Sequence, residues 1–193
     1  MSTKAVGLSR DLPAGRVMPA HVAGQDLAVW RSVSGVLSAW DNRCPHRGMA
    51  LSHGFVRGEA LACLYHGWHF DCDRHCTLIP SHPDLTPPET IQTRAFSALE
   101  DGGVIWVALE GEAQPSDDLS GYKPLRTMQF HAPEDAVGTI NILADQPVKT
   151  LLNPWGESRT LVTTLIAATA SIQAMKDATI ALETLRQQVE ARQ

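Results

Sequence analysis

Two short motifs of cysteine and histidine constrain this chain more than any other feature. The first has the form Cys-x-His, with ligand-type residues at Cys44 and His46. The second has the form Cys-x-x-His, at Cys63 and His66, and sixteen residues separate it from the first. Glycine and proline beside these residues suit tight loops. The spacing therefore predicts two loops whose tips face each other across a metal centre.

The mixed ligand set suits a [2Fe–2S] cluster of the Rieske type. In such a cluster, one iron takes two cysteines and the other takes two histidines. We expect Cys44 and Cys63 to hold the first iron, and His46 and His66 to hold the second. Neutral imidazoles in place of two thiolates raise the reduction potential, to about −150 to +300 mV across Rieske centres. The predicted cofactor is a one-electron carrier.

The same four residues allow two other interpretations. Two cysteines and two histidines can bind zinc. Zinc motifs more often keep each half homogeneous, however, with Cys-x-x-Cys in one half and His-x-x-x-His in the other. The four side chains could also be unconnected core residues. Because each half is mixed here, we favour the Rieske cluster.

A second group of metal-ligating residue types follows, at His69, Cys72, His75 and Cys76. Zinc binding is one interpretation of this group. We expect a plain turn instead, because His69 should alternate away from the core and the polar run around Cys72 is typical of a turn.

The motifs resemble the Rieske domain of Rieske non-haem iron oxygenases, which hydroxylate aromatic rings or remove methyl groups by oxygenation. The likeness includes the runs 51–54 and 65–71, begins near Leu12 and ends near Val107, so it covers a little over half of the chain. It implies an antiparallel β domain with two cluster-binding loops. One departure is Leu64, where the family usually has proline.

The resemblance also implies a mononuclear iron held by two histidines and one carboxylate. The residues after the Rieske region contain a single histidine, His131. We therefore predict no catalytic residues, and whether the chain acts as part of an enzyme stays open. The predicted C-terminal hairpin and helix loosely resemble the end of an oxygenase catalytic domain. One hypothesis is an oxygenase α-subunit that lost its middle and kept both ends.

Strand and turn signals predict a mainly β chain in three parts. Residues 1–111 form the Rieske domain, 112–124 a polar linker, and 125–193 a small α+β extension. Trp30 and Trp40 are expected in the β core. The expected strands lie at about 5–17 (with a turn), 25–31, 36–41, 51–55, 59–64, 68–71, 93–99, 104–110, 128–131, 138–143, 148–152 and 160–167.

The extension is expected to end in an amphipathic helix over about 171–191. Its apolar residues recur at helical spacing, so we expect this stripe to pack on the hairpin formed by 148–167. A self-association face is the other interpretation, and it makes an oligomer through this helix conceivable. The stripe consists of Ile172, Met175, Ala178, Leu182, Leu185 and Val189.

Charge and composition exclude several classes of function. The net charge of −5 argues against nucleic-acid binding and is compatible with docking to a basic face of a redox partner. No apolar run reaches the roughly 18 residues of a membrane span. Four cysteines, two of them assigned to the cluster, do not describe a disulfide scaffold. A reducing cytoplasm is the expected location.

The sequence favours an electron carrier that passes single electrons from a flavin- or ferredoxin-type reductase to a non-haem iron oxygenase. One alternative is a truncated or accessory oxygenase subunit that acts with a full-length partner. Another is a regulatory subunit whose cluster senses redox state. The sequence names neither the partners nor the final substrate.

Overall fold

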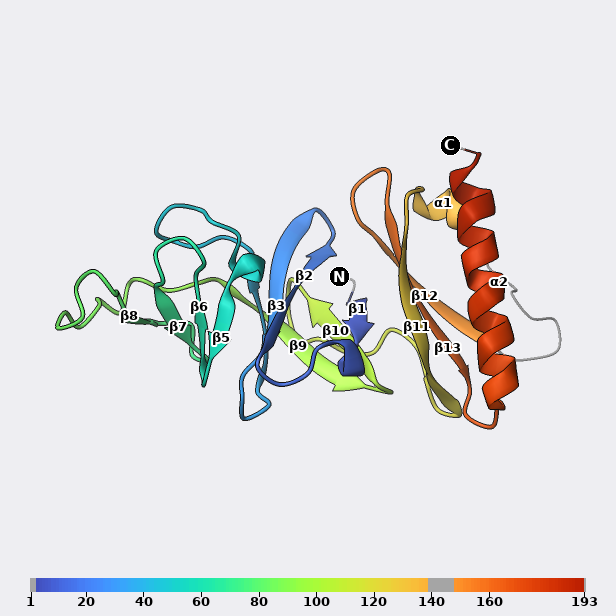
Figure 1. The fold of residues 1–193 in the computed structure, drawn as a ribbon, viewed down its shortest axis with the longest axis horizontal. Helices are drawn as coiled ribbons and strands as arrows, with labels where there is room; N and C mark the ends of the chain where they lie inside the picture. The colour runs from blue at the N-terminus through green and yellow to red at the C-terminus, as the bar shows by residue number, and fades with distance from the viewer. Residues whose placement is uncertain (1–2, 139–147, 193) are drawn as a thin grey trace.

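The computed structural model describes residues 3–138 and 148–192, and their strands form three antiparallel sheets. Figure 1 shows the sheets side by side, with the long helix α2 on the outer face of the third. The fold is mainly β, as predicted. The three sheets and α2 thus lie in one row along the molecule (Figure 1).

The first sheet is central and has six strands in the order β1-β10-β9-β4-β3-β2. Its bounds are β1 Lys4–Leu8, β2 Arg16–Val22, β3 Gln25–Arg31, β4 Leu37–Asp41, β9 Ala95–Asp101 and β10 Val104–Ala108. Trp30 and Trp40 are fully buried on this sheet, with ring centroids 4.8 Å apart in an edge-to-face arrangement. The prediction that both indoles pack the β core is confirmed.

The second sheet is small and carries the cysteine–histidine motifs. Its strands are β5 Phe55–Arg57, β6 Ala60–Ala62, β7 His69–Asp71 and β8 Cys76–Leu78, in sequence order. One core cluster joins this sheet to the central one, because Trp40 of β4 packs with Leu61 and Phe70. Both cysteines of the motifs belong to the same core, so the loops stand on a rigid base.

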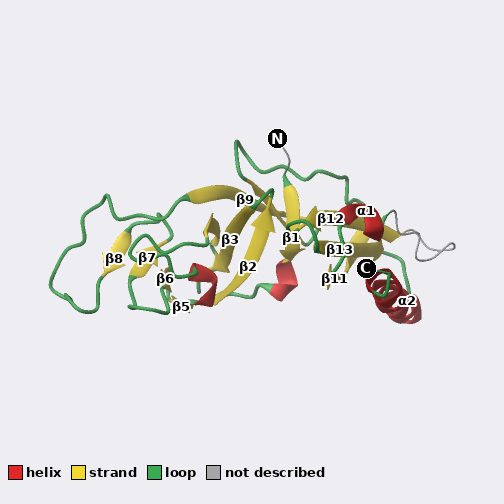
Figure 2. Ribbon diagram, turned by 90° about the horizontal axis from the view of Figure 1, so that it is seen from above, coloured by secondary structure: helices red, strands yellow, loops and turns green. Residues whose placement is uncertain are grey.

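The third sheet has the order β11-β13-β12, from Tyr122–Phe130, Thr160–Ala167 and Val148–Pro154. One face packs under α2 (Ile172–Glu190), and a short helix α1 (Glu134–Val137) lies at its end. The other face shares a core cluster with β1 and β10 of the central sheet. Figure 2 shows the second sheet at one end of the molecule and α2 at the other.

Several sequence predictions are wrong in detail. Residues 51–55 were expected as a strand, but Leu51–His53 is a 3-10 turn, fixed by the Ser52 N–H donating to Asn42 Oδ1 at 2.7 Å. The strand expected over about 5–17, with a turn, is two strands, and the second, β2, continues through Pro19 to Val22. Proline is tolerated there because β2 lies at the sheet edge, where one row of backbone N–H groups has no ladder partner to lose.

The C-terminal part differs from the prediction in two places, and a third prediction is not tested. The strand β11 starts at Tyr122, inside the range 112–124 expected as linker. The helix is confirmed, but Ile172 in its first turn is 74% exposed and leaves the buried stripe. Of the strand expected at 138–143, residues 139–143 lie outside the described residues. Within the described ranges, no helix is long and apolar enough to span a membrane.

Candidate metal centre

The two motif loops are closed by the same pair of backbone hydrogen bonds. In the first, the Cys44 N–H donates to Met49 O at 2.8 Å, and the Gly48 N–H donates to Cys44 O at 2.8 Å. In the second, the Cys63 N–H donates to Trp68 O at 2.9 Å, and the Gly67 N–H donates to Cys63 O at 3.0 Å. Counted from each cysteine, the donors and acceptors occupy identical positions. The two loops therefore have the same pattern of closing hydrogen bonds.

A glycine four residues after each cysteine allows this closure. Gly48 has φ +74° and Gly67 has φ +69°, a left-handed conformation that side chains with a Cβ disfavour. Crowding adds a second reason. A Cβ at Gly48 would lie 3.2 Å from Arg43 Nε, and a Cβ at Gly67 would lie 3.1 Å from Pro80 Cγ.

The two thiols lie inside the site and face each other. Cys44 and Cys63 are each 3% exposed, and their sulfurs are within hydrogen-bonding reach. Burial raises the pKa of the Cys44 thiol to about 11, against the opposing effect of the backbone N–H groups of His46 and Arg47, which donate to its sulfur. The Cys63 thiol raises this pKa further. Iron binding here must therefore displace a thiol proton.

The two imidazoles lie on the outer side of the thiols. Their ring centroids are 4.7 Å apart, and the planes are inclined by 61°. His46 is half-buried and stacks on Trp68, with centroids 4.2 Å apart and planes within 6°. His66 is exposed, and the Tyr65 ring lies 3.8 Å from it. Desolvation lowers the pKa of His46, with smaller contributions from His66 and Arg47, so its neutral form is favoured.

Comparison with known proteins identifies this arrangement. Residues 2–93 match the family model of the Rieske [2Fe-2S] domain. This region is a Rieske domain. Its implied cofactor is a Rieske-type [2Fe–2S] cluster, the one that the mixed motifs predicted.

Known relatives are similar to the Rieske domain and its surroundings. Oxidoreductase NdmD of Pseudomonas putida is 41% identical over 105 residues, which are 54% of this chain and 18% of NdmD. The 4beta-methylsterol monooxygenase of Methylococcus capsulatus is 41% identical over 102 residues, which are 48% of this chain and 27% of the relative. The chain thus spans less than a third of the length of either protein.

The likeness of fold extends beyond the Rieske domain. Dicamba monooxygenase superposes with a TM-score of 0.77 at 17% identity, covering 98% of this chain and 85% of that one. The caffeine complex of Pseudomonas putida NdmA gives a TM-score of 0.77 at 14% identity, covering 99% and 81%. Such coverage includes the third sheet and α2, and at these identities it concerns the fold alone.

The residues of the Rieske domain fit the cluster on an observation of their own. Among the described residues, His46 Nδ1 is buried and has no hydrogen-bond partner. An unpaired buried nitrogen costs free energy unless something binds it. Its lone pair, available in the neutral ring that desolvation favours, is a suitable iron ligand. Buried thiols beneath two imidazoles match a cluster with one Cys₂ iron and one His₂ iron.

The second group of metal-ligating residue types is spread over different neighbours. Cys72 Sγ lies 3.5 Å from Glu59 O, His75 Nδ1 lies 3.2 Å from Glu89 O, and the buried Cys76 lies 3.7 Å from Leu78 O. His69 sits on β7. In the described part of the chain, no three His, Cys, Asp or Glu side chains gather as a single-ion site. This region forms the β7–β8 turn.

Sequence reasoning missed two aromatic neighbours of the ligand-type residues. Trp68 is the stacking partner of His46, although it lies in the other loop. Tyr65 covers one side of His66. A signal was available for Trp68, because it follows Cys63 by five residues as Met49 follows Cys44. Aligning the two motifs on their cysteines would have shown the repeated loop.

Proposed function

We propose that this chain transfers single electrons within an oxygenase system, through a Rieske cluster held by Cys44, Cys63, His46 and His66. When bound, such a cluster takes up and releases one electron. The observation that carries the proposal is the difference in solvent exposure between the cysteines and His66. Both cysteines are 3% exposed, whereas His66 lies at the surface. One side is thus sealed, and the other presents an imidazole edge to a partner.

The side chains and backbone around the site serve electron transfer in separate ways. The N–H groups of His46 and Arg47 donate to the Cys44 sulfur, which favours negative charge there and raises the reduction potential. The stack on Trp68 fixes the plane of His46. A rigid site needs little reorganisation when its charge changes. These features support a fast carrier rather than a site that remodels.

The partners we propose are a flavin- or ferredoxin-type reductase and a non-haem iron oxygenase. Support comes from the relatives, which include an oxidoreductase and a monooxygenase. The oxygenase subunit of 3-chlorobenzoate-3,4-dioxygenase from Comamonas testosteroni is also 36% identical over 85 residues. Only the kind of redox system is inferred from these relatives, and their reactions and substrates are not.

A second candidate is an accessory or truncated oxygenase subunit that acts with a full-length partner. The third sheet favours it, because the likeness of fold to dicamba monooxygenase covers 98% of this chain. This sheet is also joined closely to the Rieske domain. The buried Asn153 donates from Nδ2 to His21 O at 2.8 Å, and Trp155 stacks on the His21 ring.

Two structural predictions belong to this proposal. The division into 1–111, 112–124 and 125–193 is proposed as a division of roles, with the cluster in the first part. An oligomer through α2 would use its outer face, where Ile172 and Ile180 are 74% and 65% exposed. The inner face is occupied, since Ala178 and Leu182 pack on the third sheet.

Iron and acid-labile sulfide per chain, with an electron paramagnetic resonance spectrum of the reduced protein, test the carrier function. We expect about two iron and two sulfide with a Rieske signal. About three iron for two sulfides would reveal a mononuclear site and overturn the carrier function. Stable co-purification with a full-length oxygenase would favour the accessory subunit, whereas rapid reduction by a reductase alone favours the carrier.

A further inference from the structure

The charged side chains on the two cluster loops are all positive, although the chain as a whole is acidic. The formal net charge is −5. Between residues 42 and 56 the charged side chains are Arg43 and Arg47, and residues 60–70 contain no Asp, Glu, Lys or Arg. Setting aside these two arginines leaves −7 for the rest of the chain (−5 minus +2). The local charge at the site is thus opposite to the net charge.

Both arginines lie at the first loop. Arg43 is exposed, and its Nε is 3.2 Å from the position of a Cβ on Gly48, so the guanidinium lies along the loop. Arg47 directly follows His46, and it is also exposed. Neither side chain has an ion-pair partner among the described residues. Their charge is therefore available to a partner.

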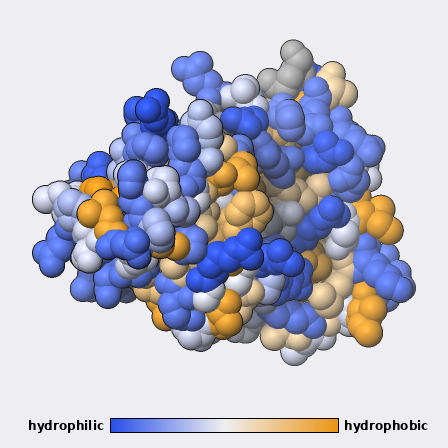
Figure 3. Space-filling view, turned by 60° about the vertical axis from the view of Figure 1, so that its left-hand side comes forward, coloured by the Kyte–Doolittle hydropathy of each residue, from blue (hydrophilic) through white to orange (hydrophobic). Residues whose placement is uncertain are grey.

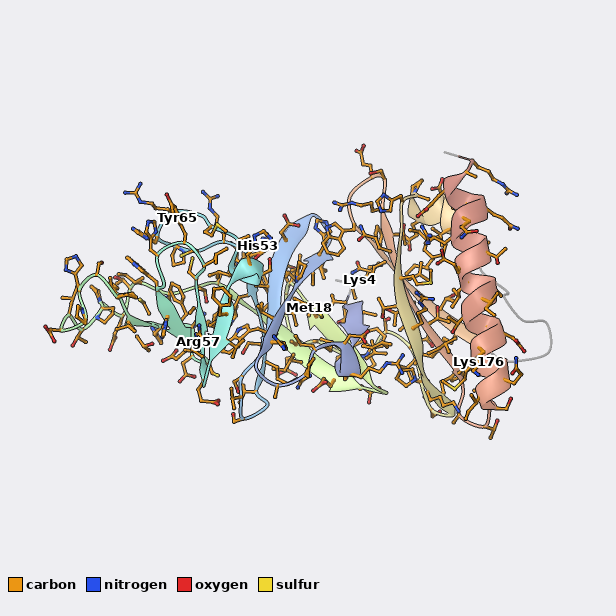
Figure 4. The ribbon with its side chains drawn as sticks, in the orientation of Figure 1. Lys4, Met18, His53, Arg57, Tyr65 and Lys176 are labelled. Atoms are coloured by element: carbon orange, nitrogen blue, oxygen red, sulfur yellow. The ribbon has the colours of Figure 1, made fainter. Side chains whose placement is uncertain are left out.

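Exposed apolar side chains accompany the arginines on the second loop. Leu64 is 46% exposed and Tyr65 is 62% exposed, beside the exposed His66. Figure 4 shows Tyr65 at the outer end of the loops, on the opposite side of the molecule from Lys176. In Figure 3, which brings this end forward, small apolar patches lie among polar side chains. An apolar centre with a charged rim is typical of a protein–protein interface.

We propose that this face, formed by Arg43, Arg47, Leu64, Tyr65 and His66, docks an electron-carrier protein whose redox centre is surrounded by carboxylates. The inference rests on the proposed function and adds the chemistry of the partner. One electron passes from the reduced partner to the site beneath His66, and no bond forms or breaks. The acidic remainder of the chain repels the same partner, which orients it toward the loops.

Two probe proteins of opposite charge test the proposal, because the net charge and the local charge predict opposite results. The first probe is a reduced, acidic plant-type ferredoxin mixed with the oxidised holoprotein in a stopped-flow instrument. The second is oxidised cytochrome c, a basic protein, mixed with the reduced holoprotein. Each second-order rate constant is measured from about 0.01 M to about 1 M salt, the range over which screening becomes complete.

With ferredoxin we expect the rate constant to fall as salt rises, and with cytochrome c we expect it to rise. The opposite pair of slopes would show that net charge governs docking, and would overturn the proposal. Calorimetric titration of oxidised ferredoxin into the oxidised holoprotein gives a readout without electron transfer. Binding that weakens with salt is expected, and no binding at low salt would also overturn the proposal.

Charge-reversal variants locate the docking face. Arg43→Glu with Arg47→Glu should lower the low-salt ferredoxin rate constant by about 10-fold or more. The matched control is Lys176→Glu with Arg192→Glu at α2, which changes the net charge by the same amount and should change the rate constant by less than about 2-fold. Iron and acid-labile sulfide should stay at about two of each per chain in both variants. The midpoint potential of each is measured as well, so that a change in driving force is separated from a change in docking. An intact cluster with equal losses in both variants would refute this docking face, whereas a missing cluster in the unmodified protein would refute the proposed function instead.

Discussion

The two cluster loops share one backbone and differ in where they place histidine. Both are closed by hydrogen bonds at the same positions relative to Cys44 and Cys63. His46 comes two residues after its cysteine, however, and His66 comes three residues after. The backbone thus sets the cysteines as an equivalent pair. One extra residue is enough to give the imidazoles different surroundings.

The consequence is a division of roles between the histidines. His46 is half-buried, stacked on Trp68, and has a buried Nδ1 with no partner in the described chain. His66 is exposed, with the Tyr65 ring beside it and the edge-on His46 ring 4.7 Å away. The first histidine is held in place by its surroundings, and the second is presented to solvent. Two loops with the same backbone closure therefore carry an asymmetric pair of candidate histidine ligands.

The largest expected effect tests the equivalence of the cysteines. Cys44→Ser and Cys63→Ser should each abolish cluster binding, because a serine hydroxyl does not supply the thiolate that iron requires. Visible absorbance, iron and sulfide measure the loss. The control is Cys72→Ser, a half-buried thiol in the turn that follows β7, which should keep the cluster. A cluster retained in only one of the two site variants would break the equivalence.

Alanine at Gly67 should destabilise the protein more than alanine at Gly48, because the neighbour of Gly67 is stiffer. Gly67→Ala should cost about 2 kcal/mol, from the left-handed φ and from the rigid Pro80 ring 3.1 Å away. Gly48→Ala should cost only about 1 kcal/mol, because it meets the movable end of Arg43. Thermal unfolding of the holoprotein measures both, at about 2–4 °C per kcal/mol.

Gly58→Ala measures the cost of placing alanine in the left-handed conformation alone, without a steric contact. Its φ is +62°, and a Cβ there would meet nothing within 4 Å. The variant should therefore match Gly48→Ala. If Gly48→Ala unfolded at a lower temperature than Gly67→Ala, Pro80 would not be the stiffer neighbour and the comparison of the loops would need revision.

The kind of cofactor could be predicted from the sequence, whereas the structure around the candidate residues could not. Cysteine and histidine are rare enough that their spacing alone pointed to the four residues. The stack of Trp68 on His46 joins two separate loops, and nothing local to either motif encodes it. The extent of β2 beyond residue 17 was missed for a similar reason, since its pairing with β3 at the sheet edge, which accommodates Pro19, is a tertiary contact.

In helix α2, the sequence predicted the element but not the burial of every residue in its apolar stripe. Its periodicity predicted the helix and the buried positions Ala178 and Leu182. The first turn kept the pattern but left Ile172 exposed, because burial depends on how far the neighbouring sheet extends. Local pattern thus fixes the kind of element, and tertiary contacts decide which of its residues are covered.

The aromatic neighbours should give a moderate effect that differs between the loops. Trp68→Leu removes the stack on His46 and should cost about 1–2 kcal/mol, and it should shift the resonance spectrum and the midpoint potential. Tyr65→Leu alters a side chain that is 62% exposed, so its stability should stay within about 0.5 kcal/mol. Equal shifts in spectrum and potential for both variants would mean that the histidines are held alike.

The smallest effect concerns the residue after each cysteine, where the first loop has Pro45 and the second has Leu64. Because the loop backbones are closed alike, Leu64→Pro should be accommodated and should stabilise by about 0.4–1 kcal/mol through the unfolded chain. Thermal unfolding of the holoprotein measures the gain. Leu64→Ala is the control, since the 46% exposed side chain contributes little, within about 0.5 kcal/mol. A lower unfolding temperature for Leu64→Pro than for Leu64→Ala would show that the two loops part in backbone conformation directly after the cysteine. The two loops would then share only their closing hydrogen bonds. The difference in histidine spacing would start at the residue directly after each cysteine.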